Sequence, residues 1–340
     1  MKNVRLALDS GAFSLYNIKF APSAKGMQSD KDLADYDYVN TAEFKQYMES
    51  YIAYLHEHKD KLDMYVALDI IYNAKATRKV QRYMESCGLE PIPVFHYGEP
   101  WSVLERLVDN YDYIGVGGLG QRTSVQSYIA FGDRVFKHVC DKHGRPRVKT
   151  HGFAMTSVQL MKRYPWYSCD SSTWSALSRN GWGRFPRLKR DGTYDWLRKP
   201  ISWRFTERSR HAPVHISKQS QLAVAYMEKY LDEMFGFTLD DMMIGYFGRD
   251  VINAGHTYLL SEALKEYYKE RWDFEEGANI YIAGHPGAGM SVPVMRRELT
   301  WARRPLKKGT PALYLASHFY PKETDIIFQA LKKSKRRKLK

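Results

Sequence analysis

The sequence predicts an α/β protein, a closed (β/α)8 TIM barrel, from three features of its first half. Short apolar runs alternate with amphipathic stretches, each run ends in a polar or glycine residue, and this unit occurs six times by residue 175. Continuous apolar strands alternating with helices are typical of a parallel sheet covered by helices. Six successive units favour a closed barrel over an open doubly wound sheet.

The units follow one another in chain order. The predicted strands are residues 4–9, 64–69, 91–96, 111–118, 147–153 and 166–172. The predicted helix 43–58 has apolar side chains at helical spacing, and residues 101–109 form another amphipathic helix. Three segments compete for the last two strands, namely residues 242–247, 279–284 and 312–317.

The predicted domain organisation is one catalytic barrel over residues 1–331, followed by a flexible basic tail at residues 332–340. The three cysteines (Cys87, Cys140 and Cys169) are far apart and form no CxxC pair, which argues against a disulfide framework and a cysteine zinc site. No apolar run is long enough for a transmembrane helix. We therefore expect a cytoplasmic protein without a membrane partner (the host cytoplasm if the protein is viral).

The charge distribution indicates a polyanionic partner. The formal net charge is +14, which is typical of a nucleic-acid-binding protein but also of a merely soluble one. Residues 179–210 hold ten Arg or Lys against three acids, interleaved with five large aromatics. We expect this insertion (about residues 178–212) to contact nucleic acid rather than form a solvated loop. The expected contacts are Arg179, Trp182, Arg184, Arg187, Lys189, Arg190, Trp203 and Arg204.

Two further basic segments are less specific. Residues 296–308 could flank the same groove. The tail could add nonspecific phosphate affinity or serve as a localisation signal, and its composition does not separate the two. The glycine-rich segment 283–289 lacks the GK[ST] ending of a phosphate-binding loop, so we expect an ordinary turn there.

Polar residues stand at the carboxyl ends of the predicted strands, where barrel enzymes carry their catalytic groups. They are Asp9, Asp69, His96, Gly117, Gly118, His151 and Asp170. A single strand-end aspartate often caps the next helix. Three aspartates and two histidines at successive strand ends favour an active site.

Four of these strand ends resemble motifs of the tRNA-guanine transglycosylase family, especially its phage relatives that modify DNA. LDSGAFS (residues 8–14) is similar to the DSGG-F motif, and VALD (66–69) to the strand whose aspartate recognises guanine. IGVGGL (114–119) resembles the segment that contacts the base through its backbone. YSCDSSTW (167–174) resembles the strand that bears the nucleophilic aspartate. The resemblance covers roughly residues 4–175.

The sequence departs from the family's tRNA-acting members at two places. Those enzymes have a zinc site of three cysteines and a histidine near the C-terminus, but this chain has no cysteine after Cys169. They also carry glutamine where this chain has His96. The missing zinc ligands favour a DNA substrate, with tRNA as the alternative, and predict no zinc subdomain. His96 in place of glutamine implies base recognition that differs in detail. We expect no metal and no cofactor.

The resemblance implies exchange of guanine for a 7-deazaguanine, such as 7-cyano-7-deazaguanine. Asp170 would be the nucleophile that forms a covalent glycosyl intermediate, and Asp9 the general acid and base. Asp69 would accept hydrogen bonds from the base, and the Gly117–Gly118 backbone would reach its carbonyl oxygen. The other expected base contacts are Ser10, Phe13, His96, His151 and Phe153.

Several alternatives stay open at this point. Phe13 and Phe153 could belong to the core, and His96 and His151 could bind a metal or be structural. A tRNA enzyme of the same chemistry, a glycosidase that cleaves without replacing the base, and a non-catalytic nucleic-acid-binding barrel are the rival functions. The oligomeric state does not follow from the sequence.

Overall fold

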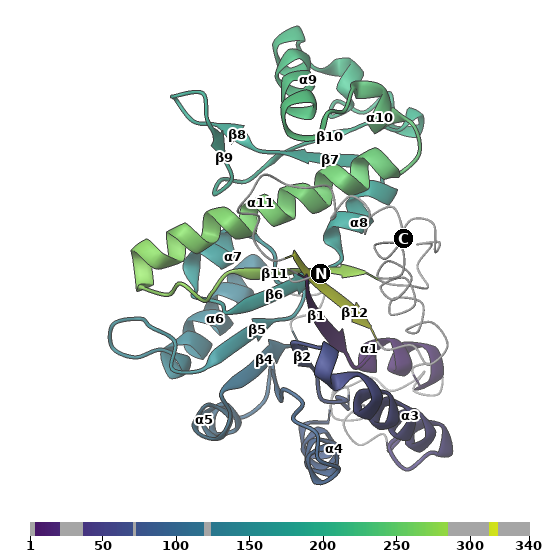
Figure 1. The fold of residues 1–340 in the computed structure, drawn as a ribbon, viewed down its shortest axis with the longest axis vertical. Helices are drawn as coiled ribbons and strands as arrows, with labels where there is room; N and C mark the ends of the chain where they lie inside the picture. Colours follow the sequence, from purple (N-terminus) through teal and green to yellow (C-terminus); the bar gives the residue numbers. More distant parts are fainter. Residues whose placement is uncertain (1–3, 21–36, 71–72, 119–123, 285–312, 319–340) are drawn as a thin grey trace, which may run out of the picture. The chain divides into compact units, whose positions relative to one another are not determined.

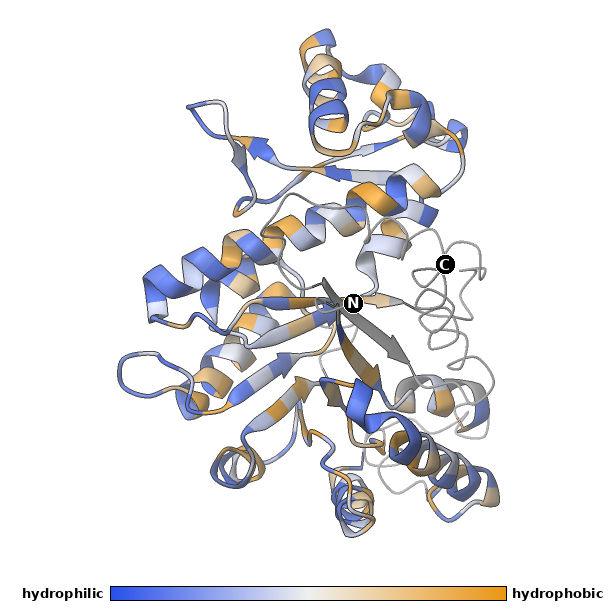
Figure 2. Ribbon diagram, in the orientation of Figure 1, coloured by the Kyte–Doolittle hydropathy of each residue, from blue (hydrophilic) through white to orange (hydrophobic). Residues whose placement is uncertain are grey.

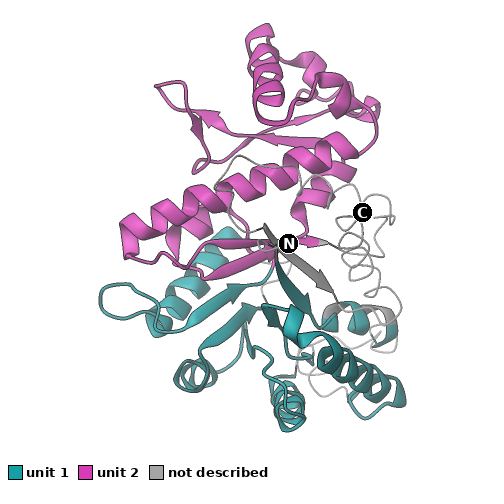
Figure 3. Cartoon of the chain, viewed as in Figure 1, with its two compact units in different colours: residues 1–153, 284–292, 314–340 teal, residues 154–283, 293–313 magenta. Residues whose placement is uncertain are grey.

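The computed structural model describes residues 4–20, 37–70, 73–118, 124–284 and 313–318. The chain is a mixed α/β protein with a central parallel sheet and helices (Figure 1). It divides into two compact units, built mainly on Met1–Phe153 (unit 1) and Ala154–Ala283 (unit 2) (Figure 3). We describe each unit by itself.

The first 153 residues, the main part of unit 1, contain five parallel strands whose spatial order follows the chain. They are β1 (Val4–Asp9), β2 (Met64–Tyr65), β3 (Val94–His96), β4 (Tyr113–Gly117) and β5 (Lys149–Gly152). β1 pairs with β2, β3 with β4, and β4 with β5. A parallel bridge between Val66 and Ile92 joins β2 to the approach of β3. The five strands predicted for this part of the chain are therefore confirmed in type and order, although β2 to β5 are all shorter than expected.

The helices of unit 1 connect these strands and are amphipathic. They are α1 (Ala12–Leu15), the π-helical turn η1 (Tyr16–Phe20), α3 (Ala42–His58), the turn η2 (Lys59–Lys61), α4 (Ala74–Ser86), α5 (Trp101–Asn110) and α6 (Val125–Val139). The side chains of Thr41, Asn73 and Ser124 cap the starts of α3, α4 and α6. Hydrophobic residues alternate with hydrophilic ones along these helices (Figure 2), and the buried ones pack on the strands.

Unit 2 begins with another strand and helix of the same kind. β6 (Ser168–Ser171) lies between α7 (Val158–Arg163) and α8 (Thr173–Arg179). It pairs in parallel with β11 (Asn279–Gly284), with Asp170 opposite Tyr281. The long helix α11 (Phe247–Trp272) precedes β11.

The basic segment that follows α8 belongs to a packed subdomain with its own core. β7 (Trp182–Phe185) pairs antiparallel with β10 (Ile201–Arg204), and β8 (Arg187–Leu188) with β9 (Tyr194–Asp195). The turns η3 (Glu207–Ser209) and η4 (Ile216–Lys218) and the helices α9 (Gln221–Phe235) and α10 (Leu239–Met243) complete it. Its core contains Phe185, Trp203, Phe205, Ile216, Met227, Tyr230, Leu231, Met242 and Ile252. The packed region thus extends well past residue 212, the expected end of the insertion.

The competition for the last strands is resolved in favour of the later two segments. Residues 279–284 are β11 and residues 313–318 are β12 (Leu313–His318). Residues 242–247 instead contain the end of α10, a turn at Gly245 with a φ of +65° and the start of α11. Residues 285–289, 296–308 and 332–340 lie outside the described part of the chain. Among the described helices, none is long and apolar enough to cross a membrane.

Candidate functional site

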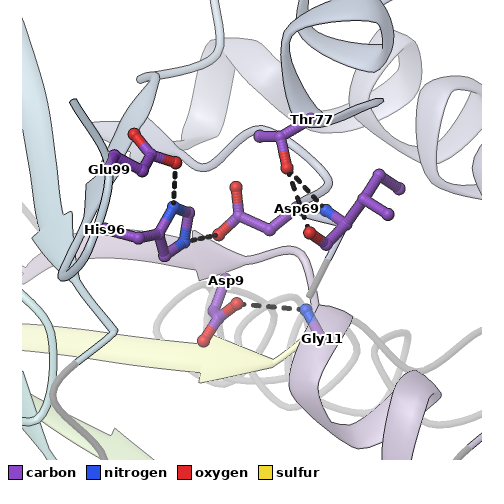
Figure 4. Close-up of polar contacts among 7 residues, drawn as sticks. Asp9, Gly11, Asp69, Thr77, His96 and Glu99 are labelled. Carbon is purple, nitrogen blue, oxygen red and sulfur yellow. Dashed lines mark hydrogen bonds and ion pairs between the residues drawn. The ribbon is translucent and has the colours of Figure 1, made fainter. Parts of the chain in front are cut away.

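Three of the expected polar side chains of unit 1 gather where β1, β2 and β3 end (Figure 4). Asp9 is the last residue of β1, and His96 is the last residue of β3. Asp69 lies four residues beyond β2, in the loop before α4. Because parallel strands present their carboxyl ends on one edge of a sheet, side chains far apart in sequence meet here.

His96 is held between two carboxylates, one from each side of its ring. Its Nε2 lies 3.2 Å from Oδ2 of Asp69, and its Nδ1 lies 3.2 Å from Oε1 of Glu99 (Figure 4). The side chains are largely shielded, with 24% of His96, 14% of Asp69 and 10% of Glu99 exposed. Both ring nitrogens therefore face an acceptor, which the doubly protonated imidazolium satisfies fully.

The charge of His96 follows from this geometry. Burial alone would lower its pKa, but the Asp69 carboxylate and then Glu99 outweigh burial and raise the pKa to about 10. At neutral pH His96 is thus a cation between two anions, and the group of three carries a net negative charge. This arrangement suits a ligand edge that donates hydrogen bonds.

The second oxygen of Asp69 has no hydrogen-bond partner among the described residues. Oδ1 is buried, and no described group donates to it, whereas Oδ2 faces His96. A buried carboxylate oxygen without a donor is unfavourable, by about 1–3 kcal/mol or more for a charged group. Such an atom at a strand end is typical of a ligand site whose ligand supplies the missing donor.

Helices α3 and α4 fix the chain around Asp9 and Asp69. Tyr47 donates its hydroxyl proton to the carbonyl of Ser10 (2.8 Å), and buried Tyr51 donates to the carbonyl of Val66 (2.7 Å). Burial, followed by the nearby Asp9 carboxylate, raises the pKa of Tyr51, so its hydroxyl stays a donor. Thr77 accepts from the amide of Ile70 (2.9 Å), directly after Asp69.

Asp9 itself turns back on the chain that follows it. One of its carboxylate oxygens accepts a hydrogen bond from the amide of Gly11 at 3.1 Å (Figure 4). Gly11 has a φ of +72°, which favours glycine and lets the chain turn directly into α1.

Two glycines, Gly115 within β4 and Gly118 directly after it, allow close approaches. Gly118 has a φ of +82°, and a Cβ there would lie 2.8 Å from the amide nitrogen of Tyr97 and 3.1 Å from Cβ of His96. A Cβ on Gly115 would lie 2.6 Å from the ring of Phe153. Gly118 thus lies tightly against the His96 backbone, while Phe153 packs on β4 and is half-buried.

The other base contacts expected in unit 1 differ in their surroundings. His151 lies within β5, is buried, and packs its ring edge-on to Phe153 with 4.6 Å between the ring centroids. Ser10 is buried, and its carbonyl is the one that receives Tyr47. The backbone of Phe13 is in α1, but its side chain lies outside what the structure describes.

Asp170, the expected nucleophile, is the third residue of β6 in unit 2. The amide of Ala154 donates a hydrogen bond of 3.0 Å to its Oδ1. Ala154 has a φ of +55°, a strained left-handed conformation for a residue with a side chain. This turn therefore aims a backbone donor at the carboxylate and fixes its orientation.

The residues expected to contact nucleic acid divide between two faces of the β7–β10 pair. Trp182, Arg184 and Arg204 alternate with the core residues and lie partly exposed on the outer face. Trp203 points to the other side: it packs on Phe185 in the core, and its indole N–H donates to Gln219. The prediction of a nucleic-acid contact for Trp203 is therefore wrong, because strand alternation puts its ring in the core.

The remaining basic residues of this group lie at helix and hairpin ends. Arg179 ends α8. Arg187, Lys189 and Arg190 are exposed on the β8–β9 hairpin, and Arg187 donates from Nε to the carbonyl of Lys199.

Sequence reasoning missed Glu99, Asn253 and His256. Glu99 follows His96 by three residues. An acidic residue in the turn after a strand-end histidine is the sequence pattern that could have identified it. Asn253 and His256 are buried in α11. The sequence of this helix does not distinguish its buried polar residues from those that face solvent.

Within the described residues, no group of three or more His, Cys, Asp or Glu side chains is arranged to hold a metal ion. Comparison with known proteins adds no name to this site. No family model matches the chain, and no curated protein or solved structure is significantly similar to it.

Proposed function

We propose that this protein is a transglycosylase that exchanges guanine in DNA for a 7-deazaguanine, such as 7-cyano-7-deazaguanine. The proposal joins the motif resemblance to the tRNA-guanine transglycosylases with the chemistry of the strand ends. A (β/α)8 barrel is the proposed full architecture. The five parallel strands of unit 1 support it, because they follow chain order without the reversal that marks a doubly wound sheet.

The observation that carries the proposal is Oδ1 of Asp69, which is buried beside the His96 cation and has no partner within the described ranges. The pairing edge of guanine and of a 7-deazaguanine presents a ring N–H next to an exocyclic amine. Either donor would satisfy Oδ1, and a base without donors there would leave the oxygen unpaired. The amide of Gly118 or its neighbour, held close to His96, would face the base carbonyl.

The proposed reaction balances without a nucleotide triphosphate or redox partner. A carboxylate oxygen of Asp170 attacks C1′ of the sugar, forming an ester-like bond, while the C1′–N9 bond breaks. The bonding pair goes to guanine, which takes a proton from Asp9. Asp9 then removes the proton from the glycosidic nitrogen of the 7-deazaguanine. This nitrogen attacks C1′, and the Asp170 carboxylate is released.

The test measures release of radiolabelled guanine from DNA, and in parallel from tRNA, with and without 7-cyano-7-deazaguanine. We expect release from DNA only when the deazaguanine is present. Release from tRNA alone would overturn the DNA assignment and keep the chemistry. Abasic sites formed without the deazaguanine would identify a glycosidase, and no release from either polymer would contradict catalysis of base exchange.

A matched pair of variants tests the nucleophile. Asp170→Asn should abolish release and the covalent protein–DNA adduct detected on denaturing gels. Asp232→Asn removes a carboxylate from an exposed position of α9 in the same unit and should retain both. Exchange that survives in Asp170→Asn would contradict the mechanism.

A further inference from the structure

The outer face of the β7–β10 pair presents two arginines and a tryptophan in a fixed register. Arg204 lies opposite Trp182, and Ser202 lies opposite Arg184. Arg184 and Arg204 are therefore diagonal neighbours on one face, within reach of each other's long side chains. The inner face carries Gly183, Phe185 and Trp203, which are buried. The core thus leaves both guanidinium groups on the same side.

Neither arginine is neutralised by an acid. No described carboxylate forms an ion pair with Arg184 or Arg204, in contrast to Arg210, which pairs with Glu207 at 2.9 Å. Burial lowers the pKa of Arg184, and Nε of Arg204 is a buried donor without a partner in the described part of the chain. A shielded cation without an acceptor is costly, so this face is short of an anion.

One face of the Trp182 ring already contacts Arg204. The guanidinium carbon of Arg204 lies 4.6 Å from the centre of the Trp182 ring, a cation–π arrangement. This contact fixes the planar group over the ring. An arginine held in this way keeps its N–H donors in a fan that suits phosphate oxygens.

Helix α11 holds this face in position through Asn253. The Asn253 side chain accepts from the amide of Arg184 (2.9 Å) and donates to the carbonyl of Trp182 (2.8 Å) and to Oγ of Ser178 (2.9 Å). One side chain thus binds both residues of β7 that carry the face.

One turn along α11, His256 supplies a second unsatisfied group. It is 2% exposed, neither ring nitrogen has a partner among the described residues, and its ring lies 5.4 Å from that of Trp196. Burial and then the neighbouring Arg184 lower its pKa to about 3, so it is a neutral imidazole. Arg184, Arg204 and His256 thus each carry donors that have no acceptor among the residues that the structure describes.

We propose that Arg184 and Arg204, backed by Trp182 and His256, form a binding site for a phosphate group of the nucleic-acid backbone. This inference rests on the proposed function for the identity of the polymer. The inference identifies the residues that would bind the phosphate group. The exposed arginines and lysine of the β8–β9 hairpin would only add general attraction.

The experiment measures binding of a fluorescein-labelled single-stranded DNA oligonucleotide to the full-length protein over a range of salt concentrations. Arg184→Gln and Arg204→Gln should each weaken binding about tenfold. Each should also reduce the slope of log affinity against log salt by about 0.7, the value for one lost phosphate contact on a single strand. Arg210→Gln removes the same charge from the same unit and should leave affinity and slope nearly unchanged.

A thermal-shift measurement determines whether the arginine variants are still folded. Inorganic phosphate should raise the Tm of the wild-type protein above its value in chloride of equal ionic strength, and should not do so in Arg184→Gln. Folded arginine variants that bind DNA like Arg210→Gln would overturn the inference. Phosphate-dependent binding without base exchange would leave this site standing and contradict only the proposed function, because binding needs neither Asp170 nor Asp69.

Discussion

Nε2 of His96 and Oδ2 of Asp69 lie 3.2 Å apart, so a cation from the end of β3 is paired with a carboxylate from the loop after β2. This pairing uses one oxygen of Asp69 and leaves the other to a ligand. Glu99 completes the arrangement from the far side of the ring. The base contact proposed for Asp69 therefore depends on two residues that need not touch the base.

Removal of Glu99 should make this arrangement sensitive to alkaline pH. In Glu99→Gln the pKa of His96 should fall below its value of about 10, because one of the two carboxylates that raise it is lost. NMR titration of histidine-labelled protein measures the change directly. The Michaelis constant for the deazaguanine should then rise at a lower pH than in wild type. Glu105→Gln, on the exposed side of α5, is the control. A His96 pKa unchanged in Glu99→Gln would contradict the pairing.

The same pairing should make stability depend on pH. The pKa of His96 is raised in the folded state, so its contribution is complete below the unfolded value of about 6.5. It is lost as pH rises towards about 10. The free energy of unfolding of wild type minus that of His96→Gln, from urea titrations, should therefore decrease from neutral pH to pH 10. A difference that stays constant or increases would refute this assignment.

Gly118 and Gly98 form a matched pair for the tight approach at His96. Both have positive φ, but a Cβ on Gly98 meets nothing within 4 Å. Gly98→Ala should lower the free energy of unfolding by about 1–2 kcal/mol, because of its backbone conformation alone. Gly118→Ala should lower the free energy of unfolding by about 1–3 kcal/mol more than Gly98→Ala does, because its Cβ would displace Tyr97 and His96. Denaturant unfolding compares the two, and equal losses would contradict the close approach.

Asn253→Ala should destabilise the protein by about 2–4 kcal/mol, because Arg184 and Trp182 lose backbone partners in a shielded setting. Asn180→Ala removes an exposed side chain that donates to the carbonyl of Ala176, and should lower the free energy of unfolding by less than about 1 kcal/mol. Urea unfolding measures both. Similar losses in the free energy of unfolding for the two variants would argue against a role of Asn253 in holding β7.

The two tryptophans of the β7–β10 pair should separate stability from binding. Trp203→Ala should lower the free energy of unfolding by about 3–5 kcal/mol, since its ring fills the core. Trp182→Ala should unfold nearly as wild type and bind single-stranded DNA about tenfold more weakly, through loss of stacking and of the support for Arg204. Loss of binding in folded Trp203→Ala alone would reverse the assignment of faces.

The sequence predicts unit 1 well because its signals are local. Apolar runs and helical spacing mark the five strands and the helices between them, and the strand-end rule brings Asp9, Asp69 and His96 together. The functional proposal itself depends on the motif resemblance. Comparison with known proteins neither supports nor refutes it.

The subdomain of unit 2 is where sequence patterns mislead. Its strands have only two to four residues, too short for alternation to stand out, so its tryptophans look alike. Its core also draws on Met242 and Ile252, some forty residues or more after Trp203, and such contacts leave no local pattern. The pairing of Glu99 with His96 likewise needs the turn geometry, which spacing alone does not give.

Helix α11 has a consequence for how a target nucleotide would be selected. Its 26 residues extend about 39 Å as one rod. Near its start Asn253 binds the backbone of Trp182 and Arg184 in β7, and near its end Tyr268 donates to the carbonyl of Met161 in α7, before β6. The helix also leads into β11, which pairs with β6 beside Asp170. If Arg184 and Arg204 bind a phosphate and Asp170 attacks the sugar, as proposed, this helix would hold the two sites at a fixed separation. The number of nucleotides between the bound phosphate and the reacting sugar would then be constant.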